Sequence, residues 1–272
     1  MPATTEPFPC PILTPLHGAL NLEVRRIPAA GERAPWMIFL HEGLGSVAEW
    51  RSWPDNLCRE LGTRGLVYSR YGYGRSTPRP ADELWPSDYL LEQARDHLPA
   101  LLKALDLTHE IPWIFGHSDG ATIALLYAAL FPDRVAGIAV TAPHVSVEPM
   151  TLTAIAAARE QYETTDLRQR LGRYHDDPDS AFGGWNDAWL NPHRAAWNIL
   201  PMLRTITCPV LAIQGENDQY ASLQQIWSIS ETVPQTECQV LPDCGHWPHR
   251  ERPEALASLV GSWMERSKAG KP

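Results

Sequence analysis

The chain has 272 residues, of which 44% are hydrophobic and 20% charged, and its formal net charge is −9 at pH 7. This composition is typical of a globular protein, and the negative charge argues against nucleic acid or an anionic membrane as a partner, since both bind clustered positive charge. The longest apolar run, 121–131, is too short to span a bilayer, and no signal-peptide pattern begins the chain. We therefore expect a cytoplasmic protein with a small-molecule substrate, and we leave a homodimer open.

The amino-terminal part combines prolines with a later alternating pattern. Prolines at positions 2, 7, 9, 11 and 15 predict an extended, poorly ordered lead-in. Residues 20–27 alternate apolar and polar side chains, as a half-exposed edge strand does.

The five cysteines are widely spaced and lack a Cys-x-x-Cys pair, which indicates reduced thiols and not a disulfide framework or a zinc site.

Continuously apolar segments then mark strands that are covered on both faces. Residues 36–40 form the first of them, and a glycine-bearing loop at 41–46 follows its carboxyl end, where open parallel sheets bind ligands. The pattern next predicts a helix at 48–61, a strand at 66–68, a glycine loop at 71–76 and a helix at 89–105 with a kink at Pro99. The glycine loop lacks the Gly-Lys-Ser/Thr sequence of a nucleotide-binding loop.

A Gly-x-Ser-x-Gly turn joins the apolar strand 113–115 to a helix pattern. Such a turn needs backbone shapes that crowd larger side chains, which explains Gly116 and Gly120 and lifts the Ser118 hydroxyl clear of the sheet edge. The flanking strand and helix therefore predict a nucleophile, although a surface serine in a glycine turn is the alternative. His117 beside it is expected to point away from the nucleophile.

The alternation of strand and helix is interrupted once. The later strands are predicted at 135–140, 209–215 and 237–241, with a closing helix after Pro253. Residues 147–203 are helical and rich in aromatic side chains, which predicts a lid over a pocket, with a structural helical layer as the alternative. The sequence thus predicts an α/β fold with a mostly parallel, doubly wound sheet of about eight strands, a core at 1–146 and 204–272, and a helical cap at 147–203.

A serine hydroxyl is a weak nucleophile near neutral pH, so it needs a base and a group that holds this base in the right tautomer. His246, in the loop after the last strand, is the predicted base, and His249 is its nearest rival. Asp218, in the loop after the strand that ends at residue 215, is the predicted carboxylate. Glu216 is the alternative, and Asp243 is less favoured.

Acyl transfer builds negative charge on the carbonyl oxygen, which two backbone N–H groups can stabilise. The N–H groups of Asp119 and Gly43 are the predicted donors of this oxyanion hole. Substrate contacts are predicted for Glu42, Leu44, Trp185, Trp189 and Trp247. The tryptophans suit an aromatic or medium-chain acyl group, and the chemistry requires no metal or cofactor.

These motifs resemble those of the α/β-hydrolase superfamily over about residues 20–265. The similar segments are the oxyanion loop at 41–46, the glycine loop at 69–76, the nucleophile elbow at 116–120 and the histidine loop at 245–246. The resemblance implies an α/β-hydrolase fold but no single substrate, because the family cleaves esters, thioesters, lactones, amides and carbon–carbon bonds with one triad. We expect a carboxylic-ester hydrolase, with a carbon–carbon bond hydrolase of ring-fission products or a non-catalytic ligand receptor as alternatives.

Two residues depart from the family pattern. Glu42 stands where the family has glycine and brings a carboxylate near the developing oxyanion. We favour a structural role in which it is turned away and paired with Arg70 or Arg75, the alternatives being a protonated carboxyl or a contact with a polar substrate group. Ser69 replaces the aspartate of the second motif, at a position that is commonly structural.

Overall fold

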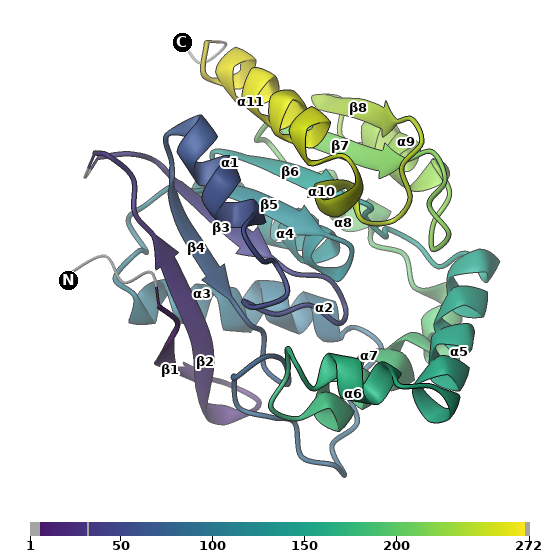
Figure 1. Cartoon of the computed structure of the whole chain (residues 1–272). Helices are drawn as coiled ribbons and strands as arrows, with labels where there is room; N and C mark the ends of the chain where they lie inside the picture. The colour runs from purple at the N-terminus through teal and green to yellow at the C-terminus, as the bar shows by residue number, and fades with distance from the viewer. Residues whose placement is uncertain (1–5, 32, 270–272) are drawn as a thin grey trace.

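The computed structural model describes residues 6–31 and 33–269, and an eight-stranded sheet forms its centre (Figure 1). The strands are β1 (Phe8–Thr14), β2 (Gly18–Ile27), β3 (Trp36–Leu40), β4 (Arg64–Tyr68), β5 (Trp113–His117), β6 (Gly137–Thr141), β7 (Val210–Gly215) and β8 (Thr236–Leu241). Their order is β1-β2-β4-β3-β5-β6-β7-β8. The pairs β1–β2 and β2–β4 are antiparallel and all others parallel, which confirms the predicted sheet.

The central strands β3, β5, β6 and β7 are buried along their whole length, because helices cover both faces of the sheet. One face packs against α1 (Trp53–Leu61) and α11 (Pro253–Ala269). The other packs against α2 (Tyr89–Glu92), α3 (Leu98–Ala104), α4 (Asp119–Leu130), α8 (Leu200–Leu203) and α9 (Gln224–Thr232). Burial on both faces explains why these strands appear in the sequence as continuous apolar runs.

The amino-terminal segment forms an edge strand, so the prediction of a poorly ordered lead-in is wrong for residues 8–14. Cys10 and Ile12 point into the core, whereas Pro9 and Pro11 are exposed. Proline has no N–H to donate, and an edge strand tolerates it where that group would face away from the sheet. The prolines therefore mark an edge position. Residues 1–5, which the same prediction covered, lie outside the described residues.

The helix expected at 89–105 is divided into three parts. A π-helical turn, η1 (Gln93–His97), separates α2 from α3. Pro99 lies in the first turn of α3, where its missing N–H costs little. A proline ring conflicts with the carbonyl four residues earlier, so the irregular turn precedes Pro99 and does not coincide with it. The helix expected at 48–61 likewise begins only at Trp53.

Residues 147–203 are named here the helical segment, which holds α5 (Pro149–Thr164), α6 (Leu167–Leu171), α7 (Pro178–Trp189), η3 (Pro192–Ala196) and α8. Its helices α5, α6 and α7 lie beyond the carboxyl ends of the strands in Figure 1. An isolated antiparallel bridge between Ser146 and Asn198 joins its two ends. The remaining short elements are η2 (Pro132–Arg134) and α10 (Pro248–Glu251). Across the described residues, no helix combines the length and the apolar character that a membrane span needs.

Candidate active site

Ser118 stands at the turn from β5 into α4. Its backbone has φ +52° and ψ −117°, a conformation that residues other than glycine rarely adopt. A Cβ atom on Gly116 would lie 2.4 Å from the carbonyl oxygen of Gly120, and one on Gly120 would lie 2.0 Å from that of Leu40. The packing of the turn therefore requires both glycines and holds Ser118 at the amino end of α4.

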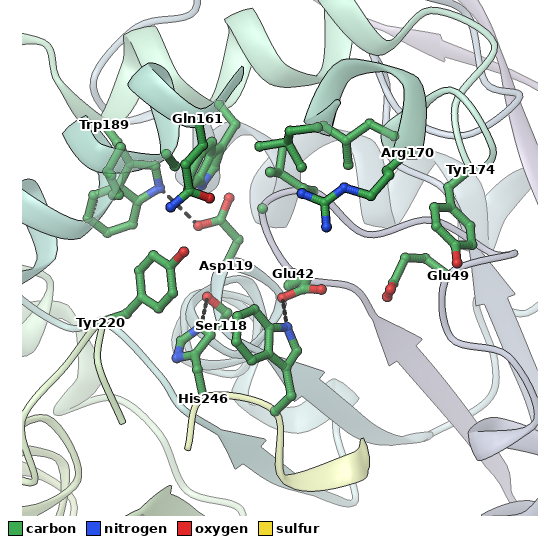
Figure 2. A pocket seen from close by; sticks show the side chains of 18 of the residues that line it. Glu42, Glu49, Ser118, Asp119, Gln161, Arg170, Tyr174, Trp189, Tyr220 and His246 are labelled. Carbon is green, nitrogen blue, oxygen red and sulfur yellow. Dashed lines mark hydrogen bonds between the residues drawn. The ribbon is translucent and has the colours of Figure 1, made fainter. Parts of the chain in front are cut away.

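Ser118, His246 and Asp218 form one hydrogen-bonded chain. His246 Nε2 lies 3.1 Å from Ser118 Oγ (Figure 2), and His246 Nδ1 lies 2.9 and 2.8 Å from the two carboxylate oxygens of Asp218. All three side chains are buried. A proton on Nδ1, donated to Asp218, leaves Nε2 as the acceptor, which is the tautomer that a general base for Ser118 needs.

Asp218 is fixed by further hydrogen bonds. Gln214 Nε2 donates to one carboxylate oxygen at 2.6 Å, and the N–H groups of Tyr220 and Ala221 donate to the other at 2.7 and 3.2 Å. Burial raises the pKa of Asp218, but the charge and hydrogen bond of His246 and the Tyr220 N–H outweigh this effect, so the pKa lies below its ordinary value. The carboxylate is therefore ionised at neutral pH and can orient the imidazole.

The alternative base and carboxylates lie elsewhere. The ring of His249 packs 4.8 Å from that of His117, and its Nε2 accepts from Arg250 Nε at 3.4 Å. Glu216 and Asp243 are exposed, and the N–H of Asp243 lies 3.5 Å from the Glu216 carboxylate. Among the described residues, none of these three side chains forms a hydrogen bond with the residues of the Ser118 chain.

Other rings surround the imidazole of His246. The centroid of Tyr220 lies 4.7 Å from it, that of Trp247 5.3 Å and that of His144 6.0 Å. Burial lowers the pKa of His144 to about 4, so this ring is neutral at pH 7 and adds no positive charge beside His246. These rings leave little of the His246 imidazole exposed to water.

Gly43 and Asp119 line the same cavity as Ser118. Asp119 is the first residue of α4, where helix N–H groups have no acceptor within the helix. Among the described residues, neither the N–H of Gly43 nor that of Asp119 finds a protein acceptor. A Cβ on Gly43 would lie 2.2 Å from Trp185 Nε1, so only glycine fits beneath this indole. Both amides are therefore available to a ligand beside Ser118.

The side chain of Asp119 has a structural role that the sequence did not indicate. It accepts hydrogen bonds from the Tyr89 hydroxyl and, at 3.1 Å, from Trp189 Nε1 (Figure 2), and it lies 3.5 Å from Arg70 Nη2. The carboxylate and the guanidinium are both almost fully buried. Because a buried charge needs such partners, these contacts fix the residue that follows the nucleophile.

A cavity of about 490 Å³ opens beside Ser118, between the sheet edge and the helical segment. All five residues predicted to contact substrate line it: Glu42, Leu44, Trp185, Trp189 and Trp247. The sequence reasoning missed several other lining residues: Arg51, Gln161, Arg170, Arg173, Tyr174 and Tyr220. Tyr220 could have been found from its position two residues after Asp218. The arginines of α6 carry no such signal, because they resemble ordinary surface residues of a helix.

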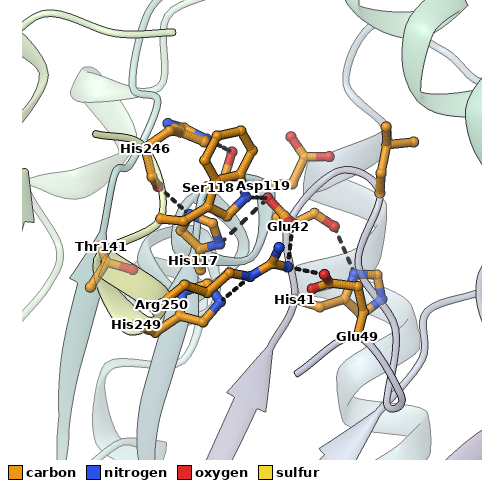
Figure 3. A network of polar contacts seen from close by, with 12 residues as sticks. His41, Glu42, Glu49, His117, Ser118, Asp119, Thr141, His246, His249 and Arg250 are labelled. Atoms are coloured by element: carbon orange, nitrogen blue, oxygen red, sulfur yellow. Dashed lines mark hydrogen bonds and ion pairs between the residues drawn. The ribbon is translucent and has the colours of Figure 1, made fainter. Parts of the chain in front are cut away.

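Glu42 is paired, as the favoured interpretation expected, but with different partners (Figure 3). Its carboxylate accepts from Trp247 Nε1 at 2.7 Å and lies 3.5 Å from Arg250 Nη2 and 3.6 Å from His117 Nδ1. Arg70 instead donates to the backbone carbonyl of Glu42 at 2.7 Å. Glu42, which stands where the family has glycine, thus links the oxyanion loop to the loop that carries His246.

Ser69 and Arg75 meet at another carboxylate. The hydroxyl of Ser69 donates to Glu23 at 2.7 Å and accepts from the N–H of Val47 at 2.9 Å. The N–H of Arg75 donates to the same Glu23 oxygen at 3.0 Å. Ser69 therefore holds the glycine loop to β2, which agrees with a structural role, and the Arg75 side chain forms no ion pair with Glu42 among the described residues.

Two clusters of described residues place three potential metal ligands within 4.8 Å of one another: His17, Glu92 and His97, and Glu42, His117 and His246. In the first, the Nε2 atoms of both histidines lie 2.7 and 3.1 Å from one Glu92 oxygen, so hydrogen bonds already join the three groups. The second cluster includes His246, the candidate base. The chemistry expected at Ser118 draws on neither cluster as a metal site.

Two features define the α/β hydrolases. One is a mostly parallel sheet with a strained serine between a strand and a helix, and the other is an aspartate and a histidine that follow this serine in the chain. The sequence model of the alpha/beta hydrolase family matches residues 37–259. The chain therefore belongs to this family and is a hydrolase, as the motifs predicted.

Similar proteins carry names that refer to different substrates. The chain is 25% identical to 2-hydroxymuconate semialdehyde hydrolase of Pseudomonas sp. strain CF600, over 90% of this chain and 95% of the relative. It is also 25% identical to the sn-1-specific diacylglycerol lipase of Mus musculus, over 91% and 88%. A structure from a study of carboxylesterases of Nitrososphaera gargenis has a TM-score of 0.75 at 19% identity, over 96% and 100%. These similarities support the fold, but they do not identify the bond that this chain cleaves.

Proposed function

We propose that the protein cleaves a carboxylic ester of a small, hydrophobic or aromatic substrate through an acyl-enzyme intermediate. The observation that carries the proposal is the 3.1 Å contact between Ser118 Oγ and His246 Nε2 beside the cavity. Ser118 attacks the carbonyl carbon while His246 takes its proton, and Asp218 stabilises the resulting imidazolium. The oxyanion accepts hydrogen bonds from the N–H groups of Gly43 and Asp119.

The second half of the reaction returns the enzyme to its starting state. His246 gives its proton to the departing alkoxide, and the acyl group stays on Ser118. A water molecule then attacks this ester as His246 takes one of its protons, and the same two N–H groups bind the second oxyanion. His246 finally protonates Ser118 Oγ as the acid leaves, so no net proton is taken up by the site.

The helical segment acts as a cap in this proposal. Its side chains Ile155, Ala158, Trp185 and Trp189 line the cavity together with residues of the core. A cap that covers a bound ester keeps bulk water away from the oxyanion and strengthens its hydrogen bonds. The apolar lining suits an apolar or aromatic part of the substrate.

Hydrolysis of a carbon–carbon bond in a ring-fission product is the second candidate. The similarity to the 2-hydroxymuconate semialdehyde hydrolase favours it. The two reactions differ in the leaving group, which is an alkoxide in one and a carbon atom that must be protonated in the other.

A two-substrate assay tests the proposal. The protein is given 4-nitrophenyl butyrate, followed by nitrophenol release, and a vinylogous diketone acid, followed by loss of its absorbance, with Ser118→Ala as the control. Faster turnover of the ester, lost in the control, supports the ester hydrolase. Faster turnover of the diketone replaces it with the second candidate, and binding of both without turnover indicates a ligand receptor.

A further inference from the structure

We propose that the substrate carries an anionic group, a carboxylate or a phosphate, which Arg51, Arg170 and Arg173 bind while the acyl carbon lies at Ser118. This inference rests on the proposed function, since it assigns the substrate class of the same cavity. A guanidinium offers planar pairs of N–H donors that match the oxygens of a carboxylate or a phosphate.

The lining of the cavity changes in character from one part to another. Near Ser118 the lining is aromatic, because Trp189 and Tyr220 lie there in Figure 2 and the Trp185 indole packs against Gly43. Arg170 and Arg173 enter from α6 and the turn after it, and Arg51 enters from the core, between β3 and α1. Figure 2 shows the guanidinium of Arg170 pointing from α6 into the cavity, on the side of Tyr174. A ligand at Ser118 can therefore extend toward arginines from two parts of the fold.

The positive charge in the cavity exceeds what its own carboxylates neutralise. The charged lining residues are Arg51, Arg170, Arg173 and Arg250 together with Glu42, Glu49 and Asp119. Asp119 pairs with Arg70, which is outside the lining, and both glutamates contact Arg250. The three remaining arginines therefore have no carboxylate partner within the lining, although the whole chain has a net charge of −9.

The contacts of these arginines leave donors free for a ligand. Arg170 pairs through Nε with Asp166, one helical turn earlier, at 3.1 Å. Within the described residues, Arg170 pairs with no carboxylate other than Asp166, and the guanidinium groups of Arg51 and Arg173 take part in no ion pair. Arg51 also has φ +52°, in the left-handed region that such side chains rarely adopt, and strain of this kind gathers at functional sites.

Substrate selectivity tests the inference, and Arg168 provides a matched control. Arg168 lies on the same helix but pairs with Asp179 at 2.6 Å and does not line the cavity. The measured quantity is the ratio of kcat/KM for 4-nitrophenyl hydrogen glutarate to kcat/KM for its neutral methyl ester. We expect a wild-type ratio of about ten or more, a fall of about fivefold or more in Arg170→Gln and in Arg173→Gln, and less than about a twofold change in Arg168→Gln. A wild-type ratio near one, or equal falls in all three variants, overturns the inference.

A binding experiment separates this inference from the reaction itself. Calorimetry on the Ser118→Ala variant compares 4-phenylbutanoate, 4-phenylbutyl phosphate and the neutral 4-phenylbutanol, none of which needs to be cleaved. Tighter binding of either anion than of the alcohol, lost when Arg170→Gln is added, supports the arginine site even if esters are not the substrates, and the tighter anion identifies the group. Equal affinities, or no binding by any probe, overturn it.

Discussion

His117 Nε2 lies 2.7 Å from the backbone carbonyl oxygen of His246, so the residue before the candidate nucleophile holds the loop that carries the candidate base (Figure 3). The ring of His117 is buried, and this burial lowers its pKa, so the ring is neutral at pH 7 and donates through Nε2. The imidazole contacts the base loop and not Ser118, as expected from the sharp turn. Its link between the two loops was not expected.

Replacing His117 with phenylalanine tests this link. His117→Phe keeps the ring and removes the donor, so we expect the free energy of unfolding to fall by about 1–3 kcal/mol, because a buried carbonyl loses its partner. We expect kcat for an ester to fall about tenfold or more, because His246 is less firmly placed. Urea unfolding and steady-state kinetics measure both. The same exchange at the exposed His109 should change the free energy by less than about 0.5 kcal/mol, and equal losses at both positions would count against the link.

Gly43→Ala tests the packing of the oxyanion loop. The new Cβ would lie 2.2 Å from Trp185 Nε1, so either the loop or the indole must move. We expect kcat for an ester to fall about tenfold to a hundredfold, since a displaced N–H no longer fits the oxyanion. Adding Trp185→Leu should restore part of this loss by relieving the collision. Full activity in the single variant would contradict the expectation that the Trp185 indole holds the oxyanion loop in place.

Glu42→Gln tests whether the carboxylate takes part in catalysis. Glutamine keeps an oxygen for the Trp247 indole and loses only the charge beside Arg250, which still contacts Glu49. We therefore expect the ester rate to fall by no more than about threefold and the free energy of unfolding by about 1 kcal/mol or less. A fall of about a thousandfold in kcat, with folding intact, would show that the carboxylate acts on the reacting groups.

His175 makes stability depend on pH. Its Nδ1 accepts from the N–H of Gly74 at 2.9 Å, its Nε2 donates to the carbonyl of Leu44 at 2.9 Å, and burial lowers its pKa to about 4. Protonation of Nδ1 would break the first bond. The unfolded chain binds this proton below a pKa of about 6.5, so between the two pKa values the unfolded state holds more protons and stability falls as the pH falls.

Unfolding in urea between pH 4.5 and 6.5 measures this dependence. His175→Gln should reduce the slope of the free energy of unfolding against pH by roughly 1 kcal/mol per pH unit, since one titrating group is removed. His109→Gln, at an exposed site, is the control variant. Identical slopes in the two variants would show that His175 is not held neutral by the fold.

Local patterns in the sequence were enough for much of this structure. Apolar runs located the buried strands, and the spacing of Gly116 and Gly120 located the turn at Ser118, because each depends on neighbouring residues only. The sequence predicted that Asp218 and His246 lie near Ser118, as they do here, because the carboxyl ends of parallel strands meet at one edge. The prolines of β1 were misread, since their meaning depends on whether the strand has a neighbour on both sides.

Contacts between distant segments were not readable from one sequence. Glu42 meets Trp247 and Arg250 more than two hundred residues later, and nothing local distinguishes these partners from Arg70. The direction of Arg170 likewise depends on how α6 lies over the sheet edge. Such pairings come from tertiary packing, which local propensity and periodicity do not encode.

The central claim is that His246 activates Ser118 as a nucleophile in the folded protein. Reaction with diisopropyl fluorophosphate, followed by intact mass and peptide mapping, tests it most directly. We expect one phosphoryl adduct per chain, on Ser118, and labelling that is slower by about a hundredfold or more in His246→Gln. No adduct on Ser118 in the folded wild-type protein, or equal labelling rates in both proteins, would contradict the claim.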